Sequence, residues 1–194
     1  AEKEELDKFA AMVLSRHPEG IHCLINNACV MNGGLLGGCS YDDFMYVQRV
    51  GVAAPFWLAS LFKDHFQGLG SIVNISSTRA FQSQADTESY TAAKGGITAL
   101  THAMAVSLAG VARVNYISPG WIDTGAWHSD SYQPHYSHGD TARVAEFLCD
   151  TRNSFINGEN VTVDGGMSRL MVYHDDCGWT FDDGHGSRSD TSTH

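Results

Sequence analysis

The chain has 194 residues, of which 43% are hydrophobic and 18% charged, and this composition fits one globular domain with a sizeable core. The formal net charge of −10 argues against nucleic acid or an anionic membrane as a partner, because phosphate binding needs clustered Lys and Arg. No apolar run reaches membrane-spanning length and no signal-peptide pattern opens the chain, so we expect a cytoplasmic protein. The five cysteines form no C-x-x-C pair, which favours free thiols over a disulfide framework or a zinc site.

The first two predicted elements are a helix and a short strand. Apolar residues fall on one helical face over residues 1–16, and Pro18 then stops the helix. Residues 21–26 form an apolar run typical of a strand, which the polar pair Asn26 and Asn27 ends. This order of elements favours an α/β fold.

A glycine-rich loop and a long helix are expected next. Residues 31–40 contain four glycines, but no helix starts from them in G-x-G-x-x-G register. We therefore interpret this segment as a mobile crossover loop beside a cleft. Residues 41–66 are mostly apolar and predict one long helix with a kink at Pro55.

One stretch carries the chemistry around which the chain is organised. Residues 72–75 predict a short buried strand with Ser77 near its end, and a helix is expected to begin near Thr87. Tyr90 and Lys94 then fall at i and i+4 on one face of that helix. A lysine ammonium one turn away favours the phenolate, so we expect it to lower the Tyr90 pKa from its usual value of about 10. A serine hydroxyl at the strand end could hold a carbonyl or alcohol oxygen while the tyrosine moves the proton.

With this spacing the chain resembles the short-chain dehydrogenase/reductase family, whose Ser…Tyr-x-x-x-Lys motif is matched by Ser77, Tyr90 and Lys94. The resemblance implies a doubly wound parallel sheet of the Rossmann-like, three-layer α/β/α type, with NAD or NADP as cofactor. It also implies reversible hydride transfer between nicotinamide and a small-molecule carbonyl or alcohol substrate. In that reaction Tyr90 is the general acid or base, Lys94 lowers its pKa and holds ribose hydroxyls, and Ser77 orients the substrate oxygen. The family further implies a homo-oligomer, either dimer or tetramer.

A second segment matches the family's N-N-A-G motif. Asn26, Asn27 and Ala28 occupy its first three positions, and Cys29 stands in place of the glycine. The resemblance assigns Asn26 and Ala28 to the adenosine side of the cofactor. The alternative is that the asparagines only cap a strand end and satisfy the backbone of a turn.

A third segment follows the helix that carries the tyrosine. Residues 111–117 predict a strand, and the sequence after it resembles the family's P-G-x-x-x-T segment. The resemblance assigns Pro119, Gly120, Ile122 and Thr124 to cofactor binding, with the backbone around Ile122 and the Thr124 hydroxyl at the nicotinamide carboxamide. The alternative is a plain turn after a strand.

Residues 125–140 are aromatic and polar without helical periodicity, and we interpret them as a substrate lid. Its three histidines match no standard ligand spacing, so no metal is expected. Trp121, Trp127 and Arg79 are expected to line the pocket.

The remaining sequence completes one predicted domain, residues 1–173. A helix is expected over residues 141–149, and residues 154–164 supply a turn and the last strand before a Gly-Gly pair that matches the family's closing signature. Residues 174–194 form a polar tail, whose tip from Asp182 is expected to be disordered.

Two departures from the family pattern bear on function. Gly51 stands where the family has an asparagine of the proton relay, and the T-G-x-x-x-G-x-G turn that holds the pyrophosphate is absent from the sequence. We therefore expect a sheet that is incomplete in its N-terminal half, with an exposed edge, and cofactor binding that is weakened or lost. The alternative to an enzyme is a non-catalytic, truncated relative that acts as a binding or scaffold module.

Overall fold

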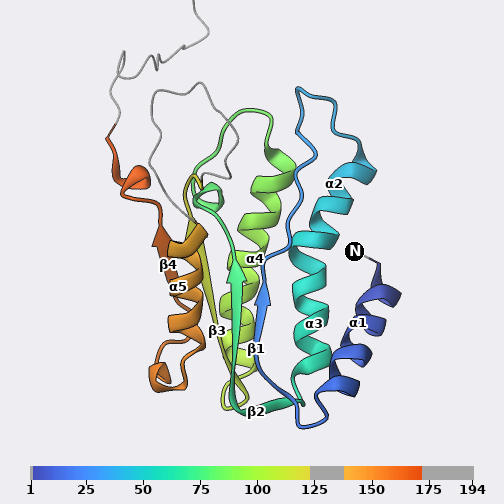
Figure 1. Ribbon diagram of the computed structural model, residues 1–194. Helices are drawn as coiled ribbons and strands as arrows, with labels where there is room; N and C mark the ends of the chain where they lie inside the picture. Colours follow the sequence, from blue (N-terminus) through green and yellow to red (C-terminus); the bar gives the residue numbers. More distant parts are fainter. Residues whose placement is uncertain (1, 123–137, 172–194) are drawn as a thin grey trace, which may run out of the picture.

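The computed structural model describes residues 2–122 and 138–171; most of the predicted lid and the whole predicted tail lie outside the described residues. Four strands pair in parallel as one sheet in the order β1-β2-β3-β4, which runs in one direction as in one half of a doubly wound sheet (Figure 1). The strands are β1 (Ile21–Asn26), β2 (Phe66–Ile75), β3 (Ala112–Pro119) and β4 (Asn160–Val163). The predicted α/β class and parallel Rossmann-like sheet are confirmed.

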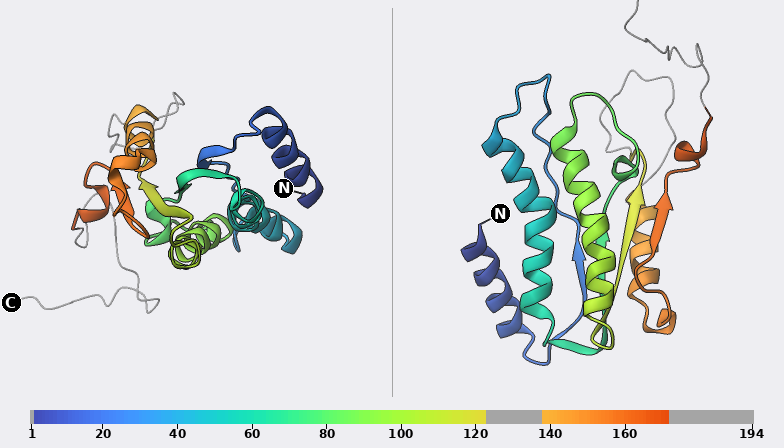
Figure 2. Two further views of the ribbon diagram at one scale, coloured as in Figure 1. Left: turned by 90° about the horizontal axis from the view of Figure 1, so that it is seen from below. Right: turned by 180° about the vertical axis from the view of Figure 1, so that it is seen from behind.

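Helices cover both faces of the sheet and give three layers. They are α1 (Lys3–Arg16), α2 (Tyr41–Gln48), α3 (Ala54–Phe62), α4 (Glu88–Ser107) and α5 (His138–Cys149). α3 and α4 lie on one face and α5 on the other, while α1 packs along α3 at the side of the molecule (Figure 2).

Each strand divides its apolar residues between two cores. On β2, Ile72 packs with the α3/α4 core, whereas its neighbour Val73 faces Leu148 of α5. On β3, Val114 belongs to the α3/α4 core and Ile117 to the core under α5. All five side chains are buried, as expected for the inner strands of a parallel sheet and the helix that covers them.

Buried polar side chains fix α4 to the sheet. The Asn26 side-chain amide donates to the Asn74 side chain at 2.8 Å, and Asn74 in turn donates to the Thr101 hydroxyl at 2.9 Å. Nearer the start of α4, the Ser76 hydroxyl donates to the Lys94 carbonyl at 3.0 Å. Because buried polar groups need partners, this set specifies the register of α4 along β2.

The single helix predicted over residues 41–66 is wrong in two respects. The helix is interrupted by a π-helical segment, Arg49–Ala53, and β2 already begins at Phe66. Pro55 lies in the first turn of α3 and has no N–H to donate to the carbonyl of Gly51, so the α-helical pattern cannot continue through this point. The irregularity therefore precedes the proline.

The glycine-rich loop packs against the segment before α4. The backbone N–H of Leu35 donates to the Glu88 carboxylate at 3.1 Å, and that of Gly37 donates to the Asp86 carboxylate at 2.7 Å. The Ser89 hydroxyl also donates to the Gly33 carbonyl. Within the described residues, neither carboxylate forms an ion pair.

β1 forms one edge of the described sheet, because within residues 2–122 and 138–171 it pairs only with β2. Ile25 on this strand is 50% exposed. An open edge of this kind agrees with the expectation from sequence.

None of the helices in the described part of the chain is long and apolar enough to cross a membrane.

Candidate active site

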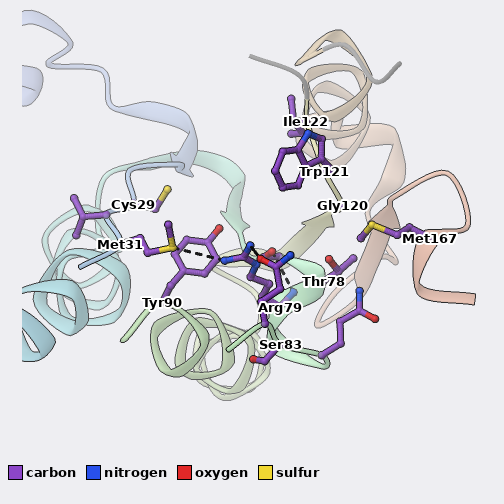
Figure 3. Close-up of a pocket in the computed structure, with 14 residues that line it drawn as sticks. Cys29, Met31, Thr78, Arg79, Ser83, Tyr90, Gly120, Trp121, Ile122 and Met167 are labelled. Atoms are coloured by element: carbon purple, nitrogen blue, oxygen red, sulfur yellow. Dashed lines mark hydrogen bonds between the residues drawn. The ribbon is translucent and has the colours of Figure 1, made fainter. Parts of the chain in front are cut away.

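A cavity of about 650 Å³ lies where β2 and β3 end. Ser77, Tyr90, Gly120 and Ile122 all line it, although they are spread over 46 positions of sequence. The crevice at the carboxyl ends of parallel strands is the usual ligand site of an open α/β sheet, and the volume is in the range of small-molecule pockets. The structure thus brings four of the predicted site residues together (Figure 3).

Local structure explains how each of these residues reaches the cavity. Ser77 follows β2 and caps the short helix η2 (Thr78–Ala80), its hydroxyl accepting from the Arg79 N–H at 3.2 Å. Tyr90 lies in the first turn of α4. Gly120 follows β3 and needs to be glycine, because a Cβ there would lie 2.7 Å from the Cβ of Asp164.

Lys94 lies behind Tyr90 and is almost fully buried, at 4% exposure. Its ammonium is 5.3 Å from the centre of the Tyr90 ring and donates to the Ile75 carbonyl at 2.7 Å. An ammonium has three donors, and among the described residues Ile75 supplies its one hydrogen-bond acceptor. Lys94 therefore keeps donor capacity for hydroxyls of a ligand.

The ionisation of the pair differs from the sequence-based expectation. Burial raises the pKa of Tyr90 above its usual value, and the nearby Cys29 raises it further, against the lowering effects of Ser77 and Arg79. Burial also lowers the pKa of Lys94. The net pKa of Tyr90 is thus raised and not lowered as the sequence led us to expect, because the removal of the phenol from water outweighs the favourable groups around it.

The other predicted site residues are placed differently. Asn26 is engaged by Asn74, Ala28 is exposed after β1, and Pro119 is buried at the end of β3 beside β4. None of these three lines the cavity. Thr124 lies outside the described residues, so its assignment stays a prediction.

The pocket residues expected from sequence are partly found. Trp121 and Arg79 line the cavity, whereas Trp127 lies outside the described residues. The glycine-rich loop, residues 31–40, borders the cavity through its first residue, Met31, whereas its glycines do not line the cavity.

Sequence reasoning missed the contributions of Cys29, Met31, Gln82, Gln84 and Met167. Cys29 could have been found, because it directly follows the N-N-A match. Met167 comes from the segment after β4, and its position depends on how that strand pairs with β3.

Residues 1–168 match the family model of enoyl-(acyl carrier protein) reductase. An uncharacterized oxidoreductase of Thermotoga maritima is 39% identical over an alignment of 176 positions, which covers 80% of this chain and 69% of that protein. The structure of an apo SCOR enzyme from Clostridium thermocellum is 40% identical with a TM-score of 0.85, over 93% of this chain and 76% of that one. A 4-hydroxyisoleucine dehydrogenase complexed with NADH is 27% identical with a TM-score of 0.76, over 88% of this chain and 78% of that one.

The parallel sheet and the cavity at its carboxyl edge are those of a Rossmann-like protein, and the similarity to named oxidoreductases places the chain among enzymes of that class. The chain belongs to the short-chain dehydrogenase/reductase family.

Proposed function

We propose that the protein is an NAD(P)-dependent oxidoreductase that transfers a hydride between the nicotinamide and the reacting carbon of a carbonyl or alcohol substrate. The observation that carries the proposal is the shared cavity of Ser77, Tyr90, Gly120 and Ile122, with Lys94 buried directly beside Tyr90. The fold relative complexed with NADH supports a nicotinamide cofactor.

The residues present fit the nicotinamide end of such a cofactor. The cavity has the volume for it, and Lys94 has donors left for ribose hydroxyls. Gly120 and Ile122 border the same space after β3. When bound, the nicotinamide supplies the hydride for reduction and accepts it for oxidation.

The chain's own residues then handle the oxygen and the proton. In reduction, the hydroxyls of Ser77 and Tyr90 donate to the substrate carbonyl oxygen. As the hydride adds to the carbon, the C=O π pair becomes a lone pair on oxygen, which takes the Tyr90 proton to give the alcohol. Lys94, 5.3 Å from the ring centre, stabilises the resulting phenolate until a proton from water restores the phenol. Oxidation reverses each step.

One observation favours the alternative of a non-catalytic module. Gly51 packs so closely on α4 that a Cβ there would lie 2.8 Å from the Cβ of Ala93, so the usual relay asparagine has no room. We also propose that the chain binds its cofactor weakly, because the sequence contains no T-G-x-x-x-G-x-G turn to hold the pyrophosphate.

The test is a titration with NADH and NADPH followed by assays of carbonyl reduction, on the full chain and on Tyr90→Phe. We expect saturable binding and a turnover that falls about 10²- to 10⁴-fold in Tyr90→Phe, the range for loss of a general acid. Tyr41→Phe is the matched control, because Tyr41 is exposed and outside the cavity. Failure to bind at millimolar cofactor, or unchanged turnover in Tyr90→Phe, contradicts the proposal.

A dimer or tetramer also stays a proposal. It is supported by the apolar groove between α3 and α4, where Phe56 is half exposed beside Leu100 and Leu108.

A further inference from the structure

Arg79 occupies the cavity beside the proposed general acid. It lies in η2, two residues after Ser77, and its guanidinium carbon is 5.7 Å from the centre of the Tyr90 ring. Figure 3 shows its side chain extending between Met31 and Tyr90 on one side and the η2 backbone on the other. The guanidinium and the Tyr90 ring therefore border the same part of the cavity.

The charge of Arg79 is not neutralised within the described residues. Its guanidinium donates to the Met31 sulfur at 3.6 Å and to the Gln84 side-chain oxygen, both neutral partners. No described carboxylate forms an ion pair with it. An arginine stays protonated at any ordinary pH, so the cavity wall carries a full positive charge.

The absence of a carboxylate partner is not due to a lack of acidic residues. The chain has 22 of them, and two stand close to Arg79 in sequence, Asp86 and Glu88. Both carboxylates accept backbone N–H groups of the glycine-rich loop instead. Among the described lining residues, Arg79 is the one with a charged side chain.

We propose that Arg79 binds a carboxylate of the substrate, so that the enzyme acts on oxo acids and hydroxy acids whose carboxylate lies near the reacting carbon. The inference rests on the proposed function, since Tyr90 fixes where the reacting oxygen binds. A single guanidinium matches the single charge of a carboxylate, and its planar fork can donate to both oxygens. Its present neutral partners are weaker acceptors that a carboxylate can replace.

The test compares acetoacetate with its methyl ester, which differ in charge but carry the same ketone. Reduction of each is measured with NADH and with NADPH for the unaltered chain, Arg79→Gln and Arg49→Gln. Arg49 is the matched control, because its guanidinium lies 5.9 Å from the Tyr46 ring outside the cavity. Because Arg79 also lowers the Tyr90 pKa, its loss can affect both substrates, so the readout is the ratio of the two; we expect kcat/KM for acetoacetate to fall about 10- to 100-fold more than kcat/KM for the ester in Arg79→Gln, as for loss of a charge-assisted hydrogen bond, and the ratio to stay unchanged in Arg49→Gln.

Each outcome separates the inference from the proposed function. If the unaltered chain reduces the ester as well as the acid, or if Arg79→Gln slows both substrates equally, the carboxylate site is refuted while the oxidoreductase proposal stands. If neither compound is reduced, the proposed function is judged by its own cofactor titration, and the carboxylate site is tested by binding, read from tryptophan fluorescence, since Trp121 lines the cavity. Acetoacetate binding that exceeds ester binding and is lost in Arg79→Gln then upholds the anion site, and equal binding of the two compounds refutes it.

Discussion

The close packing of Gly51 on Ala93 limits which side chains position 51 can carry without displacing α4, the helix of Tyr90. Gly51 lies in the π-helical segment between α2 and α3, and Ala93 directly precedes Lys94 on α4. An added Cβ at position 51 would lie 2.8 Å from the Ala93 Cβ, a separation that Cβ atoms essentially never show. Ala93 is buried at 2% exposure, so α4 cannot yield without moving Tyr90 and Lys94, the two residues of this helix that we propose to be catalytic.

The expected cost of Gly51→Ala follows from this geometry. Overpacking a core costs about 1–3 kcal/mol, from which the roughly 0.5–1 kcal/mol gained by replacing a helical glycine is subtracted. A net loss of about 1–2 kcal/mol lowers the Tm by about 2–8 °C in a chain of this size. Gly51→Asn meets the same contact, so restoring the family's asparagine alone is not expected to raise activity.

A double-mutant cycle tests the cause. Ala93→Gly removes the opposing Cβ at a cost of about 1 kcal/mol for a helical glycine. If the two methyl groups collide, Gly51→Ala in the Ala93→Gly background costs nothing more, giving a coupling energy of about 1–2 kcal/mol by urea unfolding. Additive losses, or a Gly51→Ala protein that is as stable as the original, would refute the packing argument.

Two more predictions concern ionisation in the cavity. Alcohol oxidation needs the Tyr90 phenolate, so its rate rises with pH toward the Tyr90 pKa, which burial and Cys29 hold above the usual value. The variant Cys29→Gly is expected to move this pH–rate profile to lower pH, and Cys39→Ser is the control. A shift of the profile to higher pH in Cys29→Gly would contradict the assignment. Because the pKa of buried Lys94 is lowered, its charge destabilises the folded state at neutral pH, and Lys94→Met is expected to add about 1 kcal/mol of stability while abolishing turnover. That gain begins to shrink as the pH rises through the lowered pKa of folded Lys94 and is lost above 10.5, where the lysine is mostly neutral in the unfolded chain too. A less stable Lys94→Met protein at pH 7 would count against this reasoning.

Local sequence patterns predicted helices and strands well where the signal lies within the element itself. The strand over residues 21–26 has the predicted bounds, because an apolar run between turn residues suffices to define it. The helix beginning after Thr87 likewise starts where predicted. Pro55 marked a point of irregularity in the sequence, but the sequence did not show that the turn before it, Arg49–Ala53, is π-helical, because a missing N–H does not specify which pattern the neighbouring backbone adopts.

The candidate site was predictable in its residue types and less so in its electrostatics. The motif spacing identified Ser77, Tyr90 and Lys94, and the structure gathers them. The direction of the Tyr90 pKa shift was not predictable, because it depends on how far the fold removes Tyr90 and Lys94 from water. The role of Asn26 was also ambiguous in sequence, and only the tertiary structure shows its amide joined to Asn74.

The net charge of −10 and the positive cavity are compatible because they act over different distances. At physiological ionic strength, charges separated by more than about 8 Å in solvent are largely screened, so the acidic surface barely repels an approaching carboxylate. Inside the cavity, the guanidinium of Arg79 acts at contact and in partial isolation from water, where a charge-assisted pair is stronger. Asp86 and Glu88, although near Arg79 in sequence, accept the backbone N–H groups of Gly37 and Leu35 in the glycine-rich loop and form no ion pair with Arg79 within the described residues.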